Sequence, residues 1–247
     1  MGGLGRSAVS ERDLLLGLET ATRRTTAALG DRAGRCLSVA AVDAPHRHGS
    51  MLLEHIDRVL ADADASLHDV GAIVVGTGPG SFTGLRIGMA TGKVLAYSLA
   101  VPIVGVPTPE ALAWWTSSDG PGNGGVWVVL PAGATDVYVA RLTRSPDGRP
   151  SVAHPPGLVP AGAALADAAP DGTVIAVELG PDVLGEAASA RGRDALDRLG
   201  EAIVAAGAAA LASGRHDDVA SLVPAYVALP RGVQRAAEDL AWSPDLR

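Results

Sequence analysis

The chain has 247 residues, of which 47% are hydrophobic and 19% charged, a composition typical of a globular protein that can bury a substantial core. Its formal net charge of -7 excludes the broad basic surface on which affinity for nucleic acid depends, so any RNA should be held by a partner. The single cysteine, Cys36, cannot form an internal disulfide, which favours a reducing compartment.

The beginning of the chain and its most apolar stretch give no sign of membrane targeting. Residues 1–12 are rich in glycine and polar side chains, and we expect a flexible tail without a signal peptide. The longest apolar stretch, residues 95–106, is interrupted by Pro102 and falls short of the roughly 20 residues that span a bilayer. These features favour a cytoplasmic protein without a membrane span.

Residues 13–106 predict a first lobe. Apolar runs bounded by polar or glycine-bearing turns predict strands at residues 13–19, 25–30, 36–42, 72–76 and 103–106. Ser50 could cap an amphipathic helix, whose apolar positions Leu52, Leu53, Ile56, Val59, Leu60 and Ala63 recur every three or four residues. A second helix should run from about Gly84 to Leu99. This order predicts a mixed sheet flanked by helices.

Residues 107–247 predict a second lobe with a weaker pattern. We expect a short helix at residues 110–116, a loop at 117–125 and strands at 126–130 and 136–142. Beyond residue 148 only a strand at 173–179 and an alanine-rich helix at 201–213 are indicated. The length of the chain fits either one large domain or two lobes of ordinary size, of which we favour two lobes.

A glycine-rich loop at residues 76–86 is the most informative segment, because it leaves a buried strand and enters a helix. Open α/β sheets bind ligands at such places, and glycines and free amides at a helix start favour phosphate. The residues that could contact a nucleotide are Gly78, Gly80, Ser81, Thr83, Gly84 and Arg86. The loop is neither a Walker A motif nor a full GxGxxG, so a tight structural turn is an equal alternative.

The helix after this loop carries small residues four apart, Gly84, Gly88, Gly92 and Ala96, which lie along one face. Each glycine costs about 1 kcal/mol relative to alanine in a helix, so something must pack closely against this face. The alternatives are the protein's own sheet or helices and another subunit. From the residues alone, the protein's own core is favoured.

Other candidate residues give weaker signals. His46, His48 and His55 form no HxxxH or HExxH pair, so we expect no metal site. Cys36 lies in an apolar strand, where a packed and inert thiol is expected. Glu19 could offer a carboxylate to the ligand crevice at the end of the first strand, with a polar turn as the alternative.

Four segments together resemble the TsaB (YeaZ) family: residues 18–22, 48–60, 78–88 and 102–106. The resemblance covers residues 14–113 and implies an α/β, two-lobed actin/Hsp70-like (ASKHA, ribonuclease H-like) fold. It also implies a non-catalytic scaffold subunit for TsaD, which transfers threonylcarbamoyl to the adenosine beside the anticodon of tRNA. No cofactor is expected on this chain alone, whereas ATP or ADP could be bound within the complex.

The resemblance implies partners as well: a TsaD-like subunit, a TsaE-like ATPase and a second copy of the chain, with tRNA reached only through the complex. In the family, the two first-lobe helices form the partner surface. The residues that this implies are Leu52, Leu53, Ile56, Leu60, Leu85, Gly88, Met89, Gly92 and Ala96. The chain departs from the family pattern at residues 131–138 and at 224–228, where a following arginine is displaced to Arg231.

Two enzymatic alternatives compete with this interpretation. The arrangement of strand, glycine loop and helix also fits a stand-alone ATPase or phosphotransferase of the actin-like superfamily, which needs a catalytic carboxylate near metal and phosphate. Glu19 is the early candidate for that role. A peptidase is the weaker alternative, because the sequence offers no evident pairing of nucleophile and base.

Overall fold

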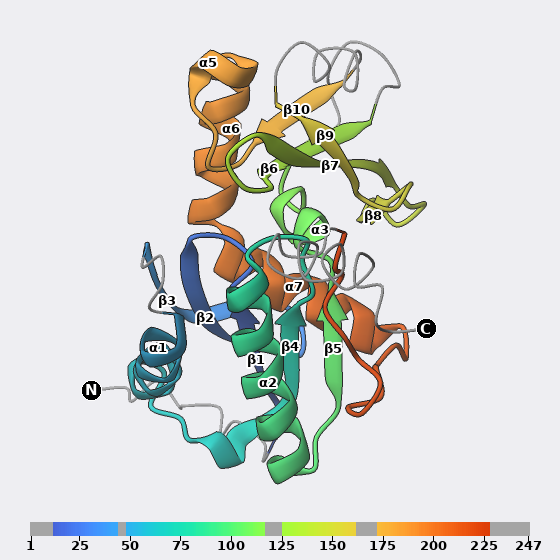
Figure 1. Cartoon of the computed structure of the whole chain (residues 1–247). Coiled ribbons are helices and arrows are strands. Elements are labelled where there is room, and N and C mark those ends of the chain that lie inside the picture. Colours follow the sequence, from blue (N-terminus) through green and yellow to red (C-terminus); the bar gives the residue numbers. More distant parts are fainter. Residues whose placement is uncertain (1–11, 44–47, 117–124, 162–171, 228–247) are drawn as a thin grey trace, which may run out of the picture.

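The structure is a computed structural model that describes residues 12–43, 48–116, 125–161 and 172–227. It has two lobes, each built around a five-stranded sheet (Figure 1). The expected N-terminal tail lies outside the described residues except for Arg12. No described helix has the length and apolar character needed to cross a membrane.

The first sheet has the strand order β3-β2-β1-β4-β5. Its strands are β1 (Leu14–Glu19), β2 (Arg24–Asp31), β3 (Cys36–Asp43), β4 (Val70–Gly76) and β5 (Ile103–Val106). The first three are antiparallel neighbours, whereas β4 pairs in parallel with β1 and with β5. This confirms the expected mixed sheet, and the continuous apolar runs of β1 and β4 are explained by burial on both faces.

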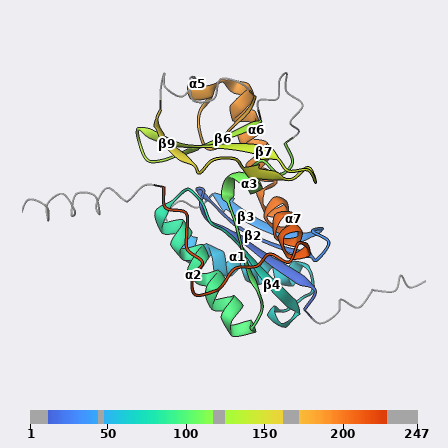
Figure 2. The same cartoon turned by 90° about the vertical axis from the view of Figure 1, so that its right-hand side faces the viewer.

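Helices cover both faces of this sheet. Helices α1 (His48–Asp62) and α2 (Phe82–Leu99) lie on one face, and α7 (Leu199–Ala212) lies on the other (Figure 2). A short 3-10 helix, η1 (Leu67–Asp69), comes between α1 and β4 in the sequence. Successive residues of β4 alternate between the two sides, since Ile73 and Val75 pack in the core beneath α1 and α2 while Val74 packs in the core beneath α7.

The second sheet contains β6 (Val126–Pro131), β7 (Asp136–Arg144), β8 (Pro150–Val152), β9 (Gly157–Pro160) and β10 (Thr173–Ala176). β6 pairs in parallel with β10, and the other pairs are antiparallel. Helices α5 (Pro181–Leu184) and α6 (Glu186–Asp197) lie above it, and α3 (Thr108–Leu112) lies between the sheets (Figure 2).

Several expected boundaries change. α1 begins before Ser50, and α2 begins at Phe82 because the hydroxyl of Ser81 accepts a hydrogen bond from the amide of Gly84 at 3.2 Å. α3 begins and ends earlier than expected. Among the described elements, five were not predicted: η1, β8, β9, α5 and α6. The buried face of α6 consists of Ala188, Ser189, Gly192 and Ala195, which leaves no aliphatic periodicity to read.

The chain returns to the first lobe after the second sheet. α7 packs on β1 and β2, and a Cβ added at Gly207 would lie less than 3.0 Å from Val74. Beyond α7, the amide of Asp217 bonds the carbonyl of Ile103 at 2.8 Å, and the amide of Ala225 bonds that of Thr77 at 2.8 Å. Residues 199–227, which we expected in the second lobe, therefore lie against the first sheet.

Candidate functional site

The glycine loop packs directly against the turn between β1 and β2. The amide of Ser81 donates to the carbonyl of Ala21 at 2.6 Å. A Cβ added at Gly80 would approach that same carbonyl, and one added at Gly84 would approach the carbonyl of Thr20, both to less than 3.0 Å. These glycines are thus explained by close contact within the protein, as in the structural alternative.

Glu19 is fully buried beneath this loop. Its carboxylate accepts hydrogen bonds from the amide of Ala21 at 2.6 Å and from the hydroxyl of Thr108 at 2.8 Å. The same hydroxyl accepts from the amide of Gly78 at 3.1 Å. Burial, opposed by these bonds, raises the pKa of Glu19 above its ordinary value. Glu19 therefore connects the strand ends with the glycine loop.

A cavity of about 630 Å³ lies between the lobes. It is lined by the turn between β1 and β2, the start of α2, the turn after β6 and Glu178; the lining residues are Ala21, Thr22, Arg23, Ser81, Phe82, Thr83, Ile87, Pro131, Gly133 and Glu178. Of the predicted nucleotide contacts, Ser81 and Thr83 line it, whereas Gly78, Gly80, Gly84 and Arg86 are not among its lining residues. The guanidinium of Arg86 instead lies 5.3 Å from the ring centroid of Phe82.

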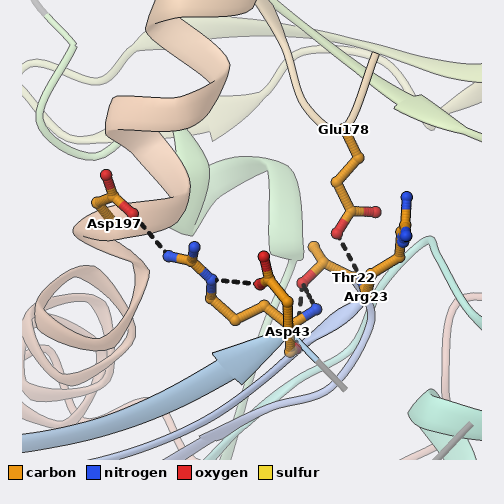
Figure 3. A network of polar contacts seen from close by, with 6 residues as sticks. Thr22, Arg23, Asp43, Glu178 and Asp197 are labelled. Atoms are coloured by element: carbon orange, nitrogen blue, oxygen red, sulfur yellow. Dashed lines mark hydrogen bonds and ion pairs between the residues drawn. The ribbon is translucent and has the colours of Figure 1, made fainter. Parts of the chain in front are cut away.

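A polar network closes one edge of this cavity (Figure 3). The amide of Arg23 donates to Glu178 at 2.6 Å, and the guanidinium of Arg24 pairs with Asp43 at 2.8 Å and Asp197 at 2.7 Å. The pKa of Glu178 is raised, chiefly by burial. Our reading of the sequence missed this network, because charged residues more than 150 positions apart carry no local signal of their proximity.

The predicted partner residues on α1 and α2 divide into one exposed residue and a buried majority. Leu53 is 58% exposed. The others are buried in the chain's own core: Leu52, Ile56, Leu60, Leu85, Gly88, Met89, Gly92 and Ala96. A Cβ added at Gly88 would meet Thr20, and one added at Gly92 would meet Val75, at less than 3.0 Å. The small-residue face therefore packs on the protein's own sheet, and its assignment to a partner surface is corrected.

The exposed apolar residues of α2 lie on its opposite side. Val94 is 64% exposed and Tyr97 is 81% exposed, and Ala90 precedes Val94 by one helical turn on the same exposed side. α1 and α2 are neighbouring helices on one face of the sheet (Figure 1). We call Leu53, Ala90, Val94 and Tyr97 the helix-pair surface.

Comparison with known proteins places the chain in a family. A family model described as TsaD: tRNA N6-adenosine threonylcarbamoyltransferase matches residues 40–176, more than half of the chain. The Escherichia coli protein named tRNA threonylcarbamoyladenosine biosynthesis protein TsaB is 33% identical over 106 residues, which are 42% of this chain and 45% of that protein. The chain belongs to the TsaB/YeaZ family.

Solved structures of the TsaB/YeaZ family share the fold. YeaZ from Pseudomonas aeruginosa matches with a TM-score of 0.65 at 23% sequence identity, covering 86% of this chain and all of that one. The expected two-lobed α/β fold with mixed sheets flanked by helices is thus confirmed. Among curated relatives, an uncharacterized protein of Mycobacterium leprae is 36% identical over 132 residues, 52% of this chain and 35% of that protein. The chain spans only 35% to 58% of the length of the first curated relatives that it matches.

In this TsaB/YeaZ chain, two of the remaining candidate residues, His55 and Cys36, occupy buried or half-buried positions. His55 is buried on α1, where burial lowers its pKa. Cys36 is half-buried in β3, with its thiol 3.6 Å from the carbonyl of Leu29, and burial raises its pKa. Within the described residues, no group of three or more His, Cys, Asp or Glu could hold a metal ion. His46 and the side chain of His48 lie outside the described residues.

The two departures from the TsaB/YeaZ pattern both lie near the cavity. Pro131 and Gly133 of the β6–β7 turn line it. Tyr226 packs on Phe82 with ring centroids 5.2 Å apart, which brings the C-terminal motif beside the start of α2. Ala228 and Arg231 of that motif lie outside the described residues.

Proposed function

We propose that this chain is a non-catalytic subunit of tRNA threonylcarbamoyladenosine synthesis that binds a TsaD-like enzyme through the helix-pair surface. Relatives at 33% to 42% identity are named for the biosynthesis of this modified nucleoside, which supports the biological process. The observation that carries the binding role is the exposure of Leu53, Val94 and Tyr97 on neighbouring helices.

Exposed apolar side chains of this size favour a protein partner. Burying apolar area contributes roughly 25 cal/mol per Å², and large aromatic residues such as Tyr97 are enriched where interfaces are most strongly bound. The surface lies on α1 and α2, whose opposite sides are fixed in the core of the first lobe by Leu52, Ile56 and Met89. A rigid face of this kind can bind without reordering the chain.

The same proposal includes the other partners. A TsaE-like ATPase and a second copy of the chain would join the assembly, tRNA would be contacted only through it, and ATP or ADP would be bound within it. The net charge of -7 supports an indirect contact with tRNA, because neutralisation of phosphates requires clustered basic residues.

A stand-alone ATPase is the second candidate, and the cavity favours it. Ser81, Thr83 and Arg23 line that cavity and could donate hydrogen bonds to a phosphate. Against it stands Glu19, whose carboxylate is enclosed and already hydrogen-bonded to Ala21 and Thr108. Nucleotide contact by the glycine loop stays a prediction, because close contacts within the protein already explain each of its glycines.

Co-purification with the TsaD-like protein of the same organism tests the binding role. We expect wild type to form a complex, and Leu53→Glu, Val94→Glu and Tyr97→Glu to weaken it at least tenfold. Leu158→Glu is the matched control, since Leu158 is 46% exposed on β9 of the other lobe. Circular dichroism checks the folding of each variant.

The outcomes separate the candidates. Loss of binding in the α1 and α2 variants with retention in Leu158→Glu supports the proposal. Equal binding by all variants would reject this surface, and absence of binding by wild type with and without ATP or ADP would reject the scaffold function. ATP hydrolysis by the purified chain that Glu19→Gln abolishes would favour the enzyme instead.

A further inference from the structure

The two lobes meet along two edges of different chemistry. On one edge, α3 and α7 share an apolar core with both sheets, including Val106, Leu112, Leu142 and Ile203. The guanidinium of Arg149, from the turn after β7, also bonds the carbonyl of Ala209 in α7 at 3.1 Å. This edge is a continuous packed core, so we expect the lobes to pivot there rather than separate.

The other edge is polar and borders the cavity. The amide of Arg23, in the turn before β2, donates to the carboxylate of Glu178, and the guanidinium of Arg24, the first residue of β2, donates to Asp197; both acceptors belong to the second lobe. Figure 3 shows both contacts side by side, with Asp43 of β3 as the second partner of Arg24. Arg23 and Glu178 line both the 630 Å³ cavity and a neighbouring one of about 420 Å³. Opening this edge would therefore join and widen the two cavities.

Glu178 is held in a backbone conformation that its residue type disfavours. Its φ of +56° lies in the left-handed region, which is unfavourable for a residue that carries a Cβ. Such strain persists only where the surroundings hold it, and the carboxylate of Glu178 accepts a 2.6 Å hydrogen bond from the amide of Arg23 across the lobe boundary.

The contact of Arg24 with Asp197 lies where the chain passes from the second lobe back to the first. Asp197 is the last residue of α6, and Arg198 is both the C-cap of α6 and the N-cap of α7. Because α6 packs on β10 and α7 packs on the first sheet, rotation at Arg198 would move one lobe relative to the other. Arg24 holds α6 immediately before this joint.

We propose that the contacts of Arg23 with Glu178 and of Arg24 with Asp197 form a latch that sets the opening of the cavity between the lobes, with the α6–α7 junction and α3 as the hinge. The latch is weak enough to open reversibly. The side chain of Asp197 is 69% exposed, and exposed ion pairs are weak because water and salt screen them.

Lobe separation measured by double electron–electron resonance tests the latch without any partner or activity. Spin labels would be attached to cysteines introduced at Asp57 of α1 and Ala187 of α6, both exposed, in a Cys36→Ser background. We expect the double variant Arg24→Gln with Glu178→Ala, which leaves the amide of Arg23 without its acceptor and Asp197 without its guanidinium, to broaden the distance distribution and shift it to a longer mean. Arg35→Gln is the control, because its 3.0 Å pair with Asp31 lies within one lobe.

Salt gives a second arm that needs no substitution in the latch. Raising ionic strength from 0.1 M to 1 M shortens the Debye length from about 10 Å to about 3 Å, so the intact latch should broaden toward the distribution of the double variant. A folded double variant with the wild-type distribution would overturn the proposal. Should that variant fail to fold, an intact latch whose distribution ignores salt would overturn it equally.

Discussion

The side chains of Glu19 and Thr108 are joined by a hydrogen bond across 89 positions of sequence, with the hydroxyl donating to the carboxylate at 2.8 Å. Both residues are fully buried. Through the same hydroxyl, the end of β1, the glycine loop and the start of α3 are held together, since Gly78 donates to it. This polar cluster makes the geometry of the loop sensitive to single substitutions.

Thr108→Val should destabilise the protein by about 1–3 kcal/mol, because it leaves the amide of Gly78 and one carboxylate oxygen of Glu19 buried without a partner. Urea unfolding measures the change. Thr143→Val, at an exposed position of β7, should change stability by less than about 0.5 kcal/mol. Equal losses in the two variants would contradict the role given to the buried bond.

Glu19→Gln should alter how stability depends on pH. Burial raises the pKa of Glu19 in the folded state, so the folded protein binds this proton more tightly than the unfolded chain does. The stabilising contribution is present below the ordinary pKa of 4.5 and is lost as the pH rises through the folded-state pKa. Relative to wild type, the glutamine variant should gain stability between pH 5 and pH 8 in urea titrations. A pH-independent difference would refute this.

His55 should contribute a pH dependence of opposite sign. Burial lowers the pKa of His55 from its ordinary value of 6.5, and its Nδ1 has no hydrogen-bond partner in the described structure. The unfolded chain therefore binds the proton more tightly, and stability falls as the pH drops below 6.5 toward the folded-state pKa. The loss in Tm between pH 7.5 and pH 5.5 should be smaller in His55→Gln than in wild type. Equal losses would show that another group titrates.

Gly92→Ala should destabilise the protein although alanine favours helix. The added Cβ would meet Val75 in β4 at less than 3.0 Å, and overpacking of this kind costs about 1–3 kcal/mol, more than the roughly 1 kcal/mol gained in helix propensity. Gly49→Ala is the control on α1, since its Cβ would lie 3.9 Å from Ile87. Thermal unfolding should show a lower Tm for Gly92→Ala and no decrease for Gly49→Ala. A stabilised Gly92→Ala would indicate that α2 can move away from the sheet.

The sequence by itself determined the elements of the first lobe. Continuous apolar runs specified β1 and β4, because a strand that is buried on both faces is apolar at successive positions. The spacing of three and four residues after Ser50 specified α1, because a helix that is buried on one face repeats its apolar residues with that period. The glycine loop and its neighbours also carried the family resemblance. The elements of the second lobe were harder to predict, because short strands such as β8 and the small-residue face of α6 have no periodic apolar residues in their sequence.

Only the tertiary structure decided which side of each helix is free and which distant charges meet. The spacing of Gly88 and Gly92 required close packing but could not name the partner, which proved to be Thr20 and Val75 of the same chain. Likewise Arg24 and Asp197 are 173 positions apart, and nothing local to either residue encodes their contact. Periodicity reports that a face is buried, whereas the identity of what buries it depends on how the whole chain folds back.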